Sequence, residues 1–74
     1  MSLQKIIGQN VRIHRTGLGW SQEKLSVRAK MSHNFIGLLE RGKVNVSAAY
    51  IEKIAKALKI EPYLLLKKKD DGKD

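Results

Sequence analysis

The apolar residues of the chain recur at helical spacing in five short segments, and nowhere do they alternate as they do in a strand. The first segment, over roughly residues 3–15, is followed by Gly17 and Gly19, which break the helical pattern. Its apolar stripe consists of Leu3, Ile7, Val11, His14 and Leu18. The pattern predicts an all-α protein that begins with one amphipathic helix.

Two more helices are expected next, and they cover roughly residues 22–29 and 33–41. Ser21 and Ser32 precede them, and a serine hydroxyl at this position accepts a hydrogen bond from the unpaired amides of the first helical turn. Lys30 lies in the break between the two helices, and Gly42 is placed to end the second one. The segment therefore predicts two short helices joined by a short turn.

The second half of the chain predicts helices over roughly residues 48–58 and 62–67. Ser47 is suited to cap the first of them, and Pro62 is suited to open the second. The last helix carries four bulky apolar residues in a row, which are Tyr63, Leu64, Leu65 and Leu66. We expect residues 1–67 to form one compact five-helix domain, and the polar residues 68–74 to form a disordered tail.

The composition of the chain favours some classes of function over others. The 74-residue chain has the size of one domain, and it has no cysteine to form a disulfide or a thiolate zinc site. Its two histidines lie far apart in the sequence, so we expect neither a metal nor a cofactor. No paired carboxylates, nucleophile with its base, or phosphate-binding glycine loop indicates an enzyme. The net charge of +8 favours a polyanionic partner, with nucleic acid first.

A membrane location is not favoured. No apolar run is long enough to span a bilayer, and the N-terminus lacks a signal-peptide pattern, so we expect a cytoplasmic protein. A basic protein on a membrane surface is an alternative explanation of the charge. Only the helix over 62–67, followed by Lys67–Lys69, approaches the amphipathic helix that this alternative requires, and it is short.

The segment over 33–41 divides its residues between two faces when it is drawn as a helix. Asn34, Gly37, Leu38 and Arg41 share one face, whereas Ile36, Leu39 and Glu40 share the other. His33 projects from the first turn. Two short helices joined by a turn in a basic domain suggest a helix-turn-helix, in which the first turn of the second helix enters the major groove of DNA.

Four pieces of sequence together resemble the lambdoid phage repressor and Cro group, known as the XRE-type regulators. The pieces are "GQNVRIHR", "SQEKL", "MSHNFIGLLERG" and "IEKIAKAL". The resemblance covers roughly residues 6–66 and implies a lambda-repressor-like five-helix fold. The loop "ERGKVNVS" is similar to that of the controllers of restriction–modification systems. Lys30 departs from the family, which usually has glycine there in a left-handed conformation.

The resemblance also implies roles for individual residues. Base edges would be read by His33, Asn34 and Leu38. The DNA backbone would be contacted by Gln22, Ser32, Arg41, Lys43 and Asn45. Arg15 and Glu40 would form a structural pair that holds the recognition helix against the first helix. The dimer interface would consist of Tyr63, Leu64, Leu65 and Leu66, although one face of this short helix could instead be tucked into the core.

These features predict a sequence-specific DNA-binding transcriptional regulator that acts as a homodimer on a pseudo-palindromic operator. The alternative is an antitoxin or adaptor whose main partner is another protein, such as a toxin or RNA polymerase. The sequence leaves open the operator, activation versus repression, and the choice between controller, phage repressor and antitoxin.

Overall fold

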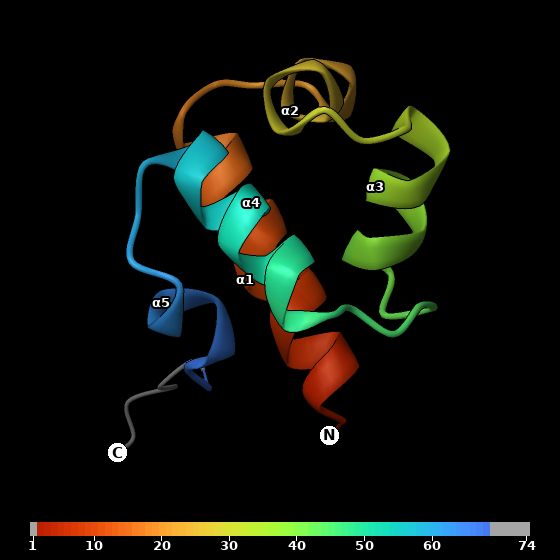
Figure 1. The fold of residues 1–74 in the computed structure, drawn as a ribbon, viewed down its shortest axis with the longest axis vertical. Helices are drawn as coiled ribbons and strands as arrows, with labels where there is room; N and C mark the ends of the chain where they lie inside the picture. Colours follow the sequence, from red (N-terminus) through yellow and green to blue (C-terminus); the bar gives the residue numbers. More distant parts are fainter. Residues whose placement is uncertain (1, 69–74) are drawn as a thin grey trace.

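The computed structural model describes residues 2–68, and this part of the chain folds into five α-helices without a strand (Figure 1). The helices follow one another as α1 (Leu3–Gly17), α2 (Gln22–Ala29), α3 (His33–Glu40), α4 (Ala48–Leu58) and α5 (Tyr63–Leu66). Each begins and ends within about two residues of its expected bounds, which confirms the predicted all-α class. Of the predicted polar tail over 68–74, all but Lys68 lies outside the described residues.

A serine hydroxyl caps each of the first four helices. Ser2, Ser21, Ser32 and Ser47 accept a hydrogen bond from the backbone amide three residues further on, at distances of 3.2, 3.0, 3.0 and 3.1 Å. The caps at Ser21, Ser32 and Ser47 were expected, whereas the cap at Ser2 was not. Each cap satisfies one of the amides that a helix start leaves unpaired, and so fixes where the helix begins.

Lysine residues in the left-handed conformation end two of the helices. Lys30 follows α2 with a φ of 58°, and Lys59 follows α4 with a φ of 61°. The conformation of Lys30 matches the expectation for this turn. A side chain in this region is strained by about 1–2 kcal/mol, and the hydrogen bonds that end the two helices hold both lysines there. The amide of Met31 donates to the Ser26 carbonyl at 2.9 Å, which closes the end of α2.

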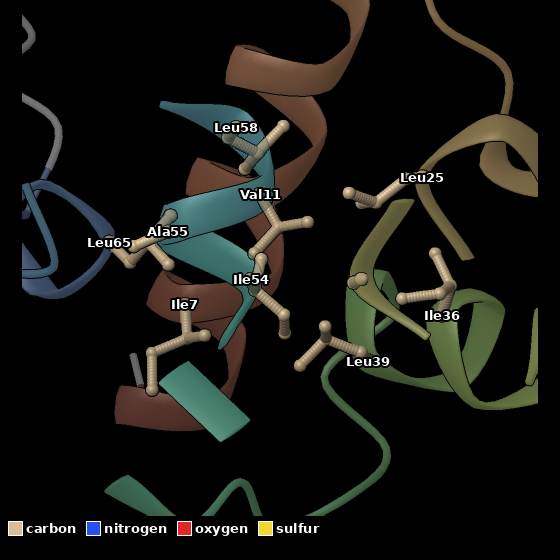
Figure 2. Packing of buried hydrophobic residues seen from close by; sticks show 10 residues of the cluster. Ile7, Val11, Leu25, Ile36, Leu39, Ile54, Ala55, Leu58 and Leu65 are labelled. Carbon is tan, nitrogen blue, oxygen red and sulfur yellow. The ribbon is translucent and has the colours of Figure 1, made fainter. Parts of the chain in front are cut away.

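The hydrophobic core lies where α1, α4 and α5 meet the helix-turn-helix formed by α2 and α3 (Figure 2). Its largest fully buried side chains are Val11, Leu25, Ile36, Leu39, Ile54 and Leu65. Leu65 was expected at a dimer interface, but it is fully buried in the core of the chain itself. The single turn of α5 must anchor itself against α1, and Leu65 points inward to do so.

The apolar stripe of α1 is buried only in its middle. Ile7 and Val11 belong to the core, whereas Leu3 and Leu18, at the two ends, are 56% and 48% exposed. The two ends of the stripe are exposed because the helix is longer than the core that covers it. None of the described helices combines the length and the apolar character needed to cross a bilayer.

Candidate nucleic-acid interface

The first turn of α3 is held in place by its cap and presents polar side chains to solvent. The Ser32 hydroxyl accepts from the Phe35 amide at 3.0 Å, so the backbone enters the helix at a fixed angle. His33 and Asn34 follow directly, and both are exposed. Their side chains therefore project from a rigid helix start, where the partial positive charge of the helix end is also concentrated.

An open groove of about 420 Å³ runs beside this turn and joins α3 to the start of α2. Its lining consists of Gln22, His33, Asn34, Gly37 and Arg41. An asparagine amide offers both a donor and an acceptor, and arginine adds a fixed positive charge. This combination suits the edge of a base pair next to a phosphate.

A charged pair fixes the opposite face of α3 against α1. The Arg15 guanidinium donates to both oxygens of the Glu40 carboxylate, from Nε at 2.6 Å and from Nη2 at 2.9 Å. Its Nη1 donates to the Trp20 carbonyl at 2.7 Å. The two side chains are only 10% and 4% exposed, so the pair predicted between Arg15 and Glu40 is present and almost fully buried.

Gln22 connects this buried pair to the groove. Its Nε2 donates to Glu40 Oε1 at 3.0 Å, so the amide nitrogen is engaged inside the protein. The resemblance implies a backbone contact for Gln22, and in this conformation its side-chain oxygen is the group left for the groove. Glu40 therefore accepts from both Arg15 and Gln22, and the position of one groove residue depends on the pair beneath it.

The other residues expected to contact DNA lie in different environments. Leu38 is half-buried and does not line the groove, although it shares the outward face of α3. Lys43 is exposed after the end of α3. Asn45 is also exposed, but its side-chain oxygen accepts a hydrogen bond from Gln4 Nε2. Gln4 was not anticipated, and it joins the start of α1 to the loop that follows α3.

Two glycines allow α3 and the loop after it to lie close to α1; sequence reasoning missed Gly8 and expected Gly42 only as a helix stop. A Cβ atom on Gly8 would meet the carbonyl oxygens of Leu39 and Glu40, the second at 2.8 Å. A Cβ atom on Gly42, which has a φ of 71°, would meet Cγ of Lys5 at 2.7 Å. The close approach at Gly8 brings Glu40 within reach of Arg15, so this glycine supports the buried pair.

Sequence reasoning also missed Asn10, which fastens α5 to α1. Its Nδ2 donates to the carbonyl oxygens of Leu65 at 2.8 Å and of Lys67 at 2.7 Å. These bonds satisfy carbonyls at the end of a helix that has no side-chain cap at its start. With Leu65 and Asn10 holding its inner side, α5 leaves Tyr63 64% exposed and Leu66 43% exposed.

The residues expected at a dimer interface are thus divided by the fold. Tyr63 and Leu66 are exposed, Leu64 is half-buried, and Leu65 belongs to the core. Within residues 2–68, no three His, Cys, Asp or Glu side chains gather closely enough to hold a metal ion.

Comparison with known proteins identifies relatives of the chain. The helix-turn-helix family matches residues 11–65. The control protein C.BamHI of Bacillus amyloliquefaciens is 41% identical over 66 residues, which cover 88% of this chain and 82% of that protein. A hypothetical transcription factor of Neisseria meningitidis is 34% identical over 64 residues. The match covers 86% of this chain but only 60% of the Neisseria protein's length.

Solved structures with a fold similar to that of this chain belong to the same kinds of protein. The crystal structure of the hypothetical transcription factor NHTF from Neisseria has a TM-score of 0.88 at 33% identity, covering 90% of this chain and 77% of that chain. The restriction-modification controller protein C.AhdI from Aeromonas hydrophila has a TM-score of 0.81 at 42% identity, covering 84% and 94% of the two chains. The chain therefore belongs to the XRE-type helix-turn-helix family of transcription regulators.

Proposed function

We propose that the protein is a sequence-specific DNA-binding regulator that inserts the first turn of α3 into the major groove. The observation that carries this proposal is the exposed pair His33 and Asn34 at a capped helix start. Asn34 is suited to a bidentate contact with adenine, and His33 to a base edge or an adjacent phosphate. The Ser32 cap fixes this turn, and the buried pair fixes the other end of α3 against α1, which supports a reading helix.

Phosphate contacts would surround this reading turn. Arg41 and Lys43 supply positive charge at the end of α3, while Ser32 still has its hydroxyl proton free to donate after accepting from Phe35. Asn45 can donate through its side-chain nitrogen, because its bond to Gln4 uses the oxygen. Leu38 would approach a thymine methyl only at the rim of the contact, since it is half-buried.

We further propose that the protein acts as a homodimer on a pseudo-palindromic operator. A single recognition helix contacts only a few base pairs, and two copies double the length of sequence that is read. The exposed Tyr63 and Leu66, with the half-buried Leu64, are the apolar residues of α5 that a second copy can cover. With DNA as its ligand, the protein would act in the cytoplasm.

The similarity to C.BamHI and C.AhdI supports a regulator of the restriction–modification controller type. A neighbouring methylase or endonuclease gene would strengthen this assignment. A neighbouring toxin gene would instead favour an antitoxin whose main partner is a protein.

The test is selection of bound DNA from a random pool, followed by titration of the selected duplex at two salt concentrations. Each Lys or Arg that neutralises a phosphate releases counterions, so six to ten contacts should cost roughly 10³–10⁵ in affinity between ~50 and ~200 mM salt. We expect a palindromic sequence to emerge and affinity to fall in this way. A pool without a shared sequence, or a flat salt response, would remove operator DNA as the main ligand.

A further inference from the structure

A second groove lies away from the candidate nucleic-acid interface, between the C-terminal ends of α2 and α4. It has a volume of about 420 Å³ and shares no lining residue with the groove beside α3. In Figure 1, α3 and the C-terminal end of α4 lie on opposite sides of the molecule. The proposed reading of DNA by α3 therefore leaves this second groove without a function.

The rim of this groove is entirely basic. Its charged residues are Arg28, Lys30, Lys53, Lys56 and Lys59. Within residues 2–68, the ion pair closer than 4.0 Å is that of Arg15 and Glu40, so no carboxylate in this part of the chain is in ion-pair contact with the rim. Five cations gathered around one concave surface repel one another, and an anionic ligand would relieve this repulsion.

The floor of the groove has a different chemistry. Ala29 and Ala57 line it, each in the last turn of its helix, and neither fills it with a large side chain. After each helix, backbone amides that follow its last residue donate hydrogen bonds to earlier carbonyls of the helix, such as those of Ser26 and Ala55. Within residues 2–68, the carbonyls of Ala29 and Ala57 accept no hydrogen bond outside the helices. The groove is thus lined by cations together with two residues whose backbone carbonyls are available as acceptors.

This combination distinguishes between two kinds of polyanion. A DNA backbone offers only acceptors, so it would leave these carbonyls without a donor. A peptide rich in Asp and Glu offers carboxylates to the cations and backbone amides to the free carbonyls. We propose that the basic groove between the ends of α2 and α4 binds an acidic peptide segment of a partner protein.

The single tryptophan of the chain provides a probe beside the groove. The Arg28 guanidinium carbon lies 5.4 Å from the centre of the Trp20 ring, and Lys24 Nζ lies at the same distance. A carboxylate that draws Arg28 toward the groove changes the charge next to the indole ring. Tryptophan emission should therefore respond when the groove is occupied.

The experiment titrates the full chain with a short poly-glutamate peptide while Trp20 emission is followed. We expect a saturable change with one peptide for each protomer. Lys56→Glu should weaken binding by about tenfold or more, because it places like charges opposite each other. Lys53→Glu provides a second variant in the groove. Arg12→Glu, which makes the same charge change at an exposed position of α1, is the matched control and should change affinity by less than about twofold.

Operator DNA separates this proposal from the proposed function. Protein saturated with operator should still bind the peptide, and Lys56→Glu should keep its affinity for operator within about threefold. Loss of operator binding in Lys56→Glu, comparable with its loss of peptide binding, would make the groove a DNA-backbone surface and overturn the proposal. Equal weakening by Lys56→Glu and Arg12→Glu, or no saturable response in the parent protein, would also overturn it.

Discussion

Helices α3 and α5 both pack against α1, but they present opposite chemistry to solvent. The outer side of α3 begins with His33 and Asn34, whereas the outer side of α5 carries Tyr63 and Leu66. Their attachments differ too. A buried charged pair and a serine cap hold α3, while one leucine and the Asn10 amide hold α5.

This difference suggests that α3 and α5 have separate roles within one 74-residue chain. A polar turn with fixed geometry suits the reading of base edges, which depends on direction. An apolar surface on a single helical turn suits association with a second copy, which depends on buried area. Because each helix has its own attachment to α1, reading and association should be separable by mutation.

The largest expected effect comes from removing the attachment of α3. Arg15→Ala or Glu40→Ala should lower the free energy of unfolding by about 3–5 kcal/mol, because each leaves a buried charge without its partner. Urea unfolding measures the loss. Arg12→Ala, at an exposed position of the same helix, is the control and should change stability by less than about 0.5 kcal/mol. Midpoints that match the parent for both pair variants would mean that α3 does not need this pair.

A neighbouring pair of leucines tests the attachment of α5. Leu65→Ala should cost about 2–5 kcal/mol of unfolding free energy, because it leaves a cavity in the core. Leu66→Ala removes the same atoms from an exposed position, so it should leave the protomer's stability almost unchanged and weaken dimerisation. Unfolding at low protein concentration and sedimentation equilibrium separate the two effects. Equal losses of stability in the two variants would contradict the observed orientation of α5.

The smallest expected effect concerns the cap of α3. Ser32→Ala should lower stability by about 1 kcal/mol, since the Phe35 amide loses its partner. Ser32→Asp should keep the cap and the stability, because aspartate also caps helices, but its charge would repel a nearby phosphate. Operator binding by Ser32→Asp is therefore the informative measurement. If Ser32→Asp binds operator as tightly as the parent, Ser32 is a cap alone and not a backbone contact.

Much of the fold could be predicted because the information is local. Serine caps, apolar spacing and glycine stops lie within a few residues of the helix ends that they define. Leu65 and Leu66 show where this reasoning fails. A run of four apolar residues in one helical turn has no polar position to set its orientation, so only packing against α1 decides which leucine is buried.

The candidate site could be predicted less completely than the fold. The resemblance to the family supplied the pair of Arg15 and Glu40, but the roles of Gly8, Asn10 and Gln4 depend on residues far away in the sequence. Asn10 acts on the carbonyls of residues 65 and 67, and Gly8 acts on the end of α3. A lone asparagine or glycine in a helix has no local signal for such a partner, so these contacts emerge only in the folded chain.

The most direct test of the division between α3 and α5 is the binding of Asn34→Ala to the selected operator and to its single-base variants. Its stability and dimerisation should match the parent. Its binding should weaken by about 1–3 kcal/mol, and discrimination should be lost at one base pair of each half-site. Lys43→Ala, the control for a backbone contact, should weaken binding about equally on every sequence. Uniform weakening by Asn34→Ala would make it a backbone contact, and unchanged binding would mean that α3 does not read DNA.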